Sequence, residues 1–262
     1  MKRRHLFELA DQPWYPRSLA DAGTAYLHLL QQKAGLDKAM VPLFRRAISD
    51  AGAARIVDLC AGGGGPTPGA RAALAADGLD VPLLLTDLEP NVGSLEARAV
   101  DPGVELHPDP IDARAVPPGL TGLRTVCNAL HHLQPDDARA VLADAQRAGQ
   151  PILIVELSER TLLNLTLGTA FIPLMVALMM PFIRPIRLPW IALTYLWPVL
   201  PWTIAWDGWV SHWRTYSLDE QRALVAPLQQ DGWVWEMGQD KVGPGHITWL
   251  WGRPDHRSGA RR

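Results

Sequence analysis

The stretch that most constrains this chain is an apolar run, residues 55–59, followed closely by four consecutive glycines, residues 62–65. An Ala-rich segment comes next, so the order predicts a strand, a tight turn and a helix. Glycine permits the positive φ values of such a turn and lets a ligand approach the backbone. At the carboxyl edge of a parallel strand, such a turn binds nucleotide-like ligands in doubly wound α/β folds. A glycine-rich surface loop is the simpler alternative.

Length, charge and cysteine content narrow the class of protein. The chain has 262 residues, enough for one large domain or one domain with an insertion. Its net charge of −2 lacks the excess of positive charge that is typical of nucleic-acid-binding proteins, so we expect no nucleic-acid partner. Its two cysteines, Cys60 and Cys127, indicate a reducing compartment without a disulfide framework. No long apolar segment follows the basic residues 2–4, so we expect no signal peptide and a cytoplasmic location.

Strands and helices alternate after an N-terminal helical region, residues 1–50, which either covers the sheet or caps a ligand site. Ser18 and Ser217 begin helix-capping patterns, and Pro42 interrupts the second predicted helix. The alternation predicts a parallel sheet with right-handed crossovers, and thus an α/β, Rossmann-like fold. The expected strands are 55–59, 81–86, 104–107, 123–128, 152–157, 233–237 and 246–251, and the expected helices are 18–30, 36–49, 68–77, 92–100, 135–148 and 217–230.

The composition changes at residue 161. Residues 161–183 and 188–206 carry no charge, and only Arg184 and Arg187 are charged between them. Runs of this length are candidates for membrane spans, but five prolines interrupt them. A spanning hairpin would also carry both arginines across the bilayer, against the positive-inside tendency. We therefore expect residues 161–206 to be an apolar insertion that caps the site and docks on a membrane surface; a lid that also packs a homodimer is the alternative.

Residues 55–157 and 217–252 resemble the class I S-adenosylmethionine (SAM)-dependent methyltransferases. The segment 58–64 reads DLCAGGG, which matches the family pattern D-x-G-x-G-x-G except that Cys60 replaces the first glycine. The resemblance implies a seven-stranded sheet in which Gly62, Gly63 and Gly64 let the backbone approach the methionine part of SAM. It also implies that Asp58 lies near the ammonium group of SAM.

Further cofactor-binding residues follow from the same resemblance. Asp87 closes the second strand, where a carboxylate can accept hydrogen bonds from both ribose hydroxyls. Asp112 is our candidate for the adenine amino group, and Asp109 competes with it for that role. Asn128 ends the fourth strand and is the last predicted cofactor contact. The cofactor is then SAM, and its product is S-adenosylhomocysteine.

The segment after Asn128 supplies the catalytic candidates. His131 and His132 resemble the paired histidines of many small-molecule and lipid-head-group methyltransferases. A histidine can act as general base because its pKa lies near neutrality. Two adjacent residues on a strand point to opposite faces, so only one of the two is expected to face the pocket. No cysteine or carboxylate stands at zinc-type spacing from them, so no metal site is predicted.

The candidates for substrate binding come from the two ends of the chain and from the fifth strand. Glu156 ends that strand, and an acid buried there needs a partner. The dense polar and aromatic segment 207–216 either anchors a polar head group or forms a hinge between the insertion and the core. The predicted substrate-binding residues are Tyr15, Glu156, Asp207, His212, Arg214 and Tyr216.

These observations predict a SAM-dependent methyltransferase that acts on a small hydrophobic or lipid-like acceptor at O, N or S. A non-catalytic membrane-associated scaffold with the same fold is one alternative, and an NAD-binding oxidoreductase is another. The enzyme would be cytoplasmic or peripheral on the inner face of the membrane. The predicted domains are a helical cap (1–50), a SAM-binding domain (51–160 and 207–252), the apolar insertion (161–206) and a basic tail (253–262).

Overall fold

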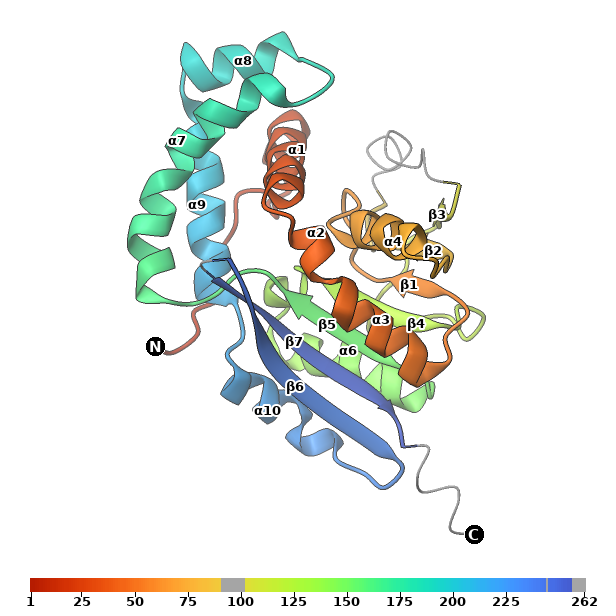
Figure 1. Ribbon diagram of the computed structural model, residues 1–262. Coiled ribbons are helices and arrows are strands. Elements are labelled where there is room, and N and C mark those ends of the chain that lie inside the picture. Colours follow the sequence, from red (N-terminus) through yellow and green to blue (C-terminus); the bar gives the residue numbers. More distant parts are fainter. Residues whose placement is uncertain (91–101, 244, 256–262) are drawn as a thin grey trace. The chain divides into compact units, whose positions relative to one another are not determined.

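The computed structural model describes residues 1–90, 102–243 and 245–255, which form two compact units. The helical unit combines Met1–Gly35 with Ser158–Thr215, and the sheet unit combines Leu36–Leu157 with Tyr216–Arg262 (Figure 1). Residues 36–50, which the sequence analysis assigned to the N-terminal cap, therefore belong with the sheet. Their apolar face, including Phe44, joins the core of that unit.

The sheet unit contains a seven-stranded sheet in the order β3-β2-β1-β4-β5-β7-β6. Strands β1 to β5 pair in parallel, whereas β7 is antiparallel to β5 and β6. The strand order reverses between β1 and β4, and ligands of open α/β sheets bind at such a switch point. The bounds are β1 (Ile56–Asp58), β2 (Leu83–Leu85), β3 (Val104–Leu106), β4 (Leu123–Cys127), β5 (Ile152–Glu156), β6 (Trp233–Val242) and β7 (Gly245–Pro254).

Alternate residues of the buried strands supply two separate cores. Ile56 joins one hydrophobic cluster and its neighbour Val57 joins the other, because successive strand residues point to opposite faces. One cluster contains residues of α3 (Val41–Ala51) and α4 (Thr67–Ala76), and the other contains residues of α6 (Pro135–Arg147) and α10 (Leu218–Val225). Helices therefore cover both faces of the sheet, which is the usual arrangement around parallel strands (Figure 1).

Capping signals in the sequence had two different outcomes. The capping box of Ser217 is confirmed: its hydroxyl accepts a hydrogen bond from the Glu220 N–H, and its own N–H donates to the Glu220 carboxylate. The cap predicted at Ser18 is wrong, because α1 (Arg17–Lys33) begins one residue earlier with Pro16 at the N-cap. Proline has a fixed φ of −60° here, which starts the helix without a side-chain cap.

Other differences concern the ends of the predicted elements. Pro42 does interrupt the second helix, which is split into α2 (Leu36–Ala39) and α3. The predicted helix 92–100 lies outside the described residues. Arg253, predicted to lie in the basic tail, is instead a residue of β7. It is paired with Val234 of β6, and its guanidinium lies 2.9 Å from the Glu236 carboxylate. Of the predicted tail, residues 256–262 also lie outside the described part of the chain.

Tryptophan rings cover glycines in the hairpin formed by β6 and β7. Trp235 lies opposite Gly252, and Trp249 lies opposite Gly238. A Cβ atom at Gly252 would come within 2.2 Å of the Trp235 ring, and one at Gly238 within 2.6 Å of the Trp249 ring. Each indole thus occupies the space that a side chain on the facing strand would need.

The helical unit is built from α1 and the apolar segment. The elements of that segment are the π-helix η2 (Asn164–Gly168), α7 (Thr169–Met179), the 3₁₀ turn η3 (Met180–Phe182), α8 (Leu188–Tyr195) and α9 (Val199–Arg214). Their core includes Tyr26, Val176, Trp190 and Leu200. Among the described residues, the helix Asn164–Phe182 is long and apolar enough to cross a membrane, and α8 with α9 passes the same test as a pair bent by 81°.

A buried ion pair fixes α6 to the sheet. Arg124 on β4 is 1% exposed, and its guanidinium lies 2.8 Å from the Asp144 carboxylate of α6. Burial lowers the pKa of Arg124, and the Asp144 carboxylate opposes that shift. The same carboxylate accepts a hydrogen bond from the Val116 N–H at 3.2 Å.

Removing one partner of this pair should therefore be costly. We expect Asp144→Ala to lower the free energy of unfolding by about 3–5 kcal/mol, since it leaves a buried guanidinium without its counter-ion. Asp136→Ala, on the exposed pair with Arg139 in the same helix, should cost less than about 1 kcal/mol. Urea denaturation followed by circular dichroism measures both, and equal losses would contradict this account.

Candidate functional site

The glycine-rich turn lies between the end of β1 and α4. Gly62 and Gly64 have φ values of +54° and +97°, and Cys60 has φ of +57°. The position at which the sequence departs from the glycine pattern therefore still has the left-handed backbone that glycine adopts without strain. The turn is fixed by hydrogen bonds from the Ala61 N–H to the Thr86 carbonyl (3.0 Å) and from the Gly64 N–H to the Ala61 carbonyl (2.7 Å).

Asp58 stands at the end of β1 and is buried. Its Oδ1 accepts a hydrogen bond of 2.5 Å from the Thr125 hydroxyl of β4, the residue opposite it in the parallel pairing. Burial raises the pKa of Asp58 to about 7; the bond from Thr125 opposes that shift, and the negative charge of Asp87 adds to it. A positively charged group next to Asp58 would restore its ionised form.

Asp87 follows β2 and binds the glycine turn directly. Its Oδ2 accepts a hydrogen bond of 2.7 Å from the Gly62 N–H, and its Oδ1 accepts one of 2.9 Å from the Glu89 N–H. A carboxylate has about four lone-pair sites, so two backbone bonds leave room for hydroxyl donors. The side chain predicted to bind ribose is thus held beside the turn predicted to bind the rest of the ligand.

Asp112 lies in the loop that follows β3. Its carboxylate binds the Arg114 guanidinium, with the closest nitrogen–oxygen distance at 2.8 Å, and this bond lowers the pKa of Asp112. Arg114 also binds Asp137 of α6 at 2.7 Å. The Ile111 N–H donates to the Asp87 carbonyl at 2.8 Å, which fixes the loop to the end of β2. Asp109 is exposed in the same loop.

The thiol of Cys60 lies close enough to Asp58, Asp87 and Asp112 for the charge of each to affect its pKa. Burial, followed by the charges of Asp87, Asp58 and Asp112, raises the pKa of Cys60 to about 12, and the Arg114 charge opposes that shift. The thiol is therefore protonated near neutral pH and is no nucleophile. The structure thus brings the three predicted cofactor-binding acids together around one turn, with Asp112 paired to Arg114.

Asn128 ends β4 in a left-handed conformation, with φ of +54°. Its side-chain oxygen accepts a hydrogen bond of 3.3 Å from the Leu157 N–H just after β5. Its own N–H donates to the Val155 carbonyl at 2.7 Å. Asn128 thus joins the ends of two adjacent strands, and its predicted contact with the cofactor stays a prediction.

His131 and Glu156 form a buried pair at the same edge of the sheet. The exposed fractions of their side chains are 1% and 0%, and His131 Nδ1 lies 2.7 Å from Glu156 Oε2. The His131 N–H also donates to Glu156 Oε1 at 3.3 Å. The partner that an acid buried at the end of the fifth strand requires is therefore this histidine. The predicted role of Glu156 in substrate binding is not tested by this contact.

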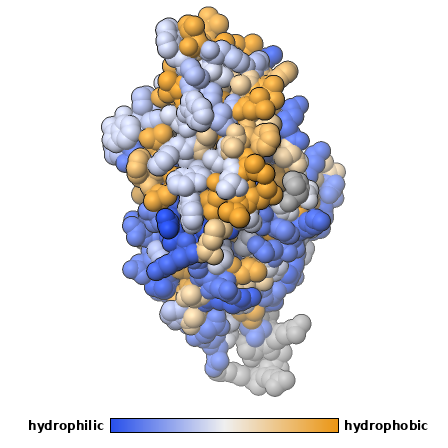
Figure 2. Space-filling model, turned by 90° about the vertical axis from the view of Figure 1, so that its left-hand side faces the viewer, coloured by the Kyte–Doolittle hydropathy of each residue, from blue (hydrophilic) through white to orange (hydrophobic). Residues whose placement is uncertain are grey.

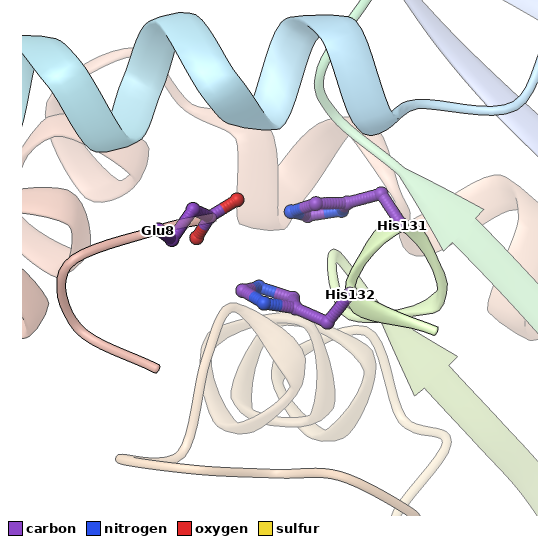
Figure 3. Close-up of side chains that lie close together, drawn as sticks. All are labelled: Glu8, His131 and His132. Atoms are coloured by element: carbon purple, nitrogen blue, oxygen red, sulfur yellow. The ribbon is translucent and has the colours of Figure 1, made fainter. Parts of the chain in front are cut away.

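His131 and His132 lie in the 3₁₀ turn η1 (Leu130–His132) rather than on a strand. Their ring centroids are 4.3 Å apart with an interplanar angle of 35°, so one imidazole lies over the other in a tilted stack (Figure 3). The rule that adjacent strand residues point to opposite faces does not apply to a 3₁₀ turn, whose successive residues are about 120° apart. The expectation that the two rings separate was therefore based on the wrong local geometry.

Most of the predicted substrate-binding residues lie in the helical unit, and two of them, Asp207 and Arg214, contact its N-terminal segment. Asp207 on α9 accepts hydrogen bonds from the Leu9 N–H (2.6 Å) and the Ala10 N–H (3.1 Å). Burial raises the pKa of Asp207 to about 6, although these two bonds lower it. Arg214 is 3% exposed and binds Asp11 at 2.6 Å. These contacts join α9 to the N-terminal segment within the helical unit, and both roles considered for segment 207–216 stay predictions.

The other candidates are placed as follows. Tyr15 lies in the turn before α1, and burial raises its pKa. His212 lies on α9. Tyr216 belongs to the sheet unit, is 2% exposed, and donates a hydrogen bond of 2.8 Å to the Leu133 carbonyl. Substrate binding by any of these residues stays a prediction.

Two residues of the site were missed by the sequence analysis. Thr125 supplies the donor that Asp58 needs, and Arg114 neutralises Asp112. The pairing of Arg114 with Asp112 could have been predicted from the sequence, since an arginine two residues after an acid can reach its carboxylate. Thr125 had none, because its role depends on the register of β4 against β1.

The strained position in the turn makes a prediction about stability. A β-branched residue is a strong outlier at positive φ, so we expect Cys60→Val to lower the free energy of unfolding by about 1–3 kcal/mol. Cys60→Gly relieves the strain but loses the packing of the thiol, and should change it by less than about 1 kcal/mol. Urea denaturation of the two variants tests this contrast; a valine variant as stable as the glycine variant would contradict the left-handed assignment.

The fold agrees with that of solved methyltransferases. Human N-acetylserotonin methyltransferase in complex with SAM is 12% identical, with a TM-score of 0.52 over 87% of this chain and 55% of that one. The plantazolicin methyltransferase in complex with S-adenosylhomocysteine is 9% identical, with a TM-score of 0.52 over 94% of each chain. This chain spans about half the length of the human protein (55%).

Comparison with protein-family models and with curated proteins finds no match. At identities of 9% and 12%, the structural likeness shows the fold alone. Together with the strand order, it confirms the predicted fold class, the seven-stranded Rossmann-like sheet of the SAM-dependent methyltransferases.

Proposed function

We propose that this protein transfers a methyl group from SAM to a small hydrophobic acceptor. The observation that carries the proposal is the set of three carboxylates around the glycine turn, Asp58, Asp87 and Asp112, at the switch point of the sheet. SAM carries a sulfonium and an ammonium group, so acids at this edge attract it. The Asp87 carboxylate beside the turn would repel the pyrophosphate of NAD, which disfavours the oxidoreductase alternative.

Each residue of the turn has a defined part in this proposal. Asp58 would pair with the ammonium group, and the backbone of Gly62–Gly64 would lie against the methionine portion. Asp87 would accept hydrogen bonds from the ribose hydroxyls, using lone pairs that its two backbone bonds leave free. Asp112 would accept a hydrogen bond from the adenine amino group while Arg114 holds its carboxylate in place.

Bound SAM would supply an electrophilic methyl group, so the protein needs to position an acceptor and exclude water. His131 would remove a proton from an acceptor that must lose one. When its Nδ1–H donates to the Glu156 carboxylate, Nε2 keeps the lone pair that a general base requires. Glu156 is then a positioning residue that fixes the ring and its tautomer. His132, stacked on His131, restricts the orientation of that ring.

The acceptor is proposed to be small and hydrophobic or lipid-like, with O, N or S as the methylated atom. The uncharged composition of residues 161–183 and 188–206 supports an apolar acceptor. The name of the human protein, N-acetylserotonin methyltransferase, is that of a small-molecule methyltransferase, which is consistent with this class. A cytoplasmic location is part of the proposal, since SAM is made and used there.

Binding of SAM tests the proposed function. Gly62, Gly64 and Gly65 have positive φ, whereas Gly63 is not among the residues with this conformation. Gly63→Val should therefore leave the fold intact but block the close approach of a ligand, and we expect it to weaken SAM binding by at least about tenfold in calorimetry. Gly149→Ala, at a positive-φ turn after α6, is the control for effects on the backbone. Undiminished binding in Gly63→Val would reject this site.

The raised pKa of Asp58 predicts proton release on binding. Its pKa of about 7 in the free protein keeps it mostly protonated at pH 6, and a bound ammonium group would lower that pKa. We therefore expect a proton to be released on SAM binding at pH about 6, and affinity to rise with pH up to about 7. Calorimetry in two buffers of different ionisation enthalpy measures this. Asp58→Asn should abolish the release. If the release persists in this variant, the proton comes from another group and the role of Asp58 is wrong.

A further inference from the structure

One face of the helix that runs through η2, α7 and η3 is apolar and exposed. Six large hydrophobic side chains recur on it at spacings of three or four residues, the period of a single helix face. Their exposed fractions range from 52% to 66%. We call this face the α7 stripe; it consists of Leu163, Leu167, Phe171, Leu174, Leu178 and Phe182.

The opposite face of the same helix packs inside the helical unit. Val176 and Met179 are buried in a cluster with Ala22 and Tyr26 of α1 and with Leu200 of α9. The stripe is therefore not the core side of the helix, and no part of the described helical unit covers it. Figure 2 shows hydrophobic side chains gathered on this side of the molecule. An exposed apolar face of this extent indicates a binding surface.

The charged and aromatic residues that follow the stripe are of the types that favour a lipid surface. The segment 161–206 contains two charged residues, Arg184 and Arg187, and no acid. Exposed aromatic side chains stand at the bend between α8 and α9: Tyr195 (52%), Trp197 (62%) and Trp202 (67%). Tryptophan and tyrosine favour the boundary between lipid and water, and arginines favour anionic headgroups.

We propose that the α7 stripe lies in the plane of an anionic lipid bilayer, half immersed, with Arg184 and Arg187 at the headgroups. A spanning orientation is disfavoured by α1, because α1 packs against α7 and α9 and carries Asp21 and Lys33. The hydrogen bond from Trp190 Nε1 to the Ser18 carbonyl (3.1 Å) also joins α8 to the start of α1. Spanning would carry these polar groups into hydrocarbon, whereas a helix lying in the interface leaves them in water.

Flotation of the full-length protein with vesicles tests this proposal. We expect it to float with phosphatidylcholine vesicles that contain about 30% phosphatidylglycerol, and to float less with pure phosphatidylcholine. The double variant Leu174→Gln, Leu178→Gln should reduce the partition coefficient by about tenfold or more, because two inserted side chains become polar. The double variant Arg184→Gln, Arg187→Gln should remove the preference for the anionic vesicles.

The matched control is Leu27→Gln, which replaces a leucine of α1 that is 44% exposed and outside the stripe. It should float like the unmodified protein. A fluorophore that reports polarity, attached at Leu178→Cys, should shift to the blue on adding the anionic vesicles, whereas one at Leu27→Cys should not. Unfolding curves of the leucine variants should coincide with that of the unmodified protein, since each replaced leucine is exposed.

Two outcomes would overturn the proposal. If the unmodified protein fails to float with either vesicle, the stripe has no lipid partner. If light scattering then shows a dimer that the Leu174→Gln, Leu178→Gln variant dissociates, a second copy of this chain covers the stripe. SAM binding measured on the same samples is independent of both results, so failure here would leave the proposed methyl transfer untouched.

Discussion

The hydrogen bond between the Thr125 hydroxyl and the Asp58 carboxylate holds together the edge on which the candidate site is built. It joins the ends of β1 and β4, the two strands between which the order of the sheet reverses. A carboxyl group is costly to bury unless it is hydrogen-bonded or neutral, and Asp58 is both bonded and close to neutral in the free protein. The glycine turn begins just beyond it, and the left-handed residues Cys60 and Asn128 redirect the chain after each of these strands.

Much of the fold was predictable from the sequence because buried parallel strands and their helices carry strong local patterns. The apolar runs ending at Asp58 and Glu156 marked strands, and Ser217 with Glu220 marked a helix start. What failed depended on local geometry that no pattern records. The 3₁₀ turn that stacks His131 on His132 is one case, and the start of α1 at Arg17, with Pro16 as its N-cap, is another.

The candidate site was predictable as a set of positions but not as a set of contacts. Asp58 and Asp87 end predicted strands, Asp112 lies in the loop after the third, and the methyltransferase resemblance marks all three; the structure brings them together around Cys60. The sequence analysis did not identify Thr125 or Arg114, since a partner across a sheet depends on register. For the polar residues of α9 two roles stayed open, substrate binding and a structural hinge. Their contacts with the N-terminal segment could not be predicted, because they join residues about 200 positions apart in the sequence.

The paired glycines and tryptophans of the β6–β7 hairpin have a consequence for the order of the sheet. The Trp235 and Trp249 rings occupy the space that side chains at positions 252 and 238 would need, so these two pairs favour the observed alignment. A slip by one residue would turn every side chain to the opposite face, and a slip by two would bring each tryptophan against a bulkier neighbour. The two glycines thus help to fix the alignment of β6 against β7, and with it the register in which β7 pairs with β5.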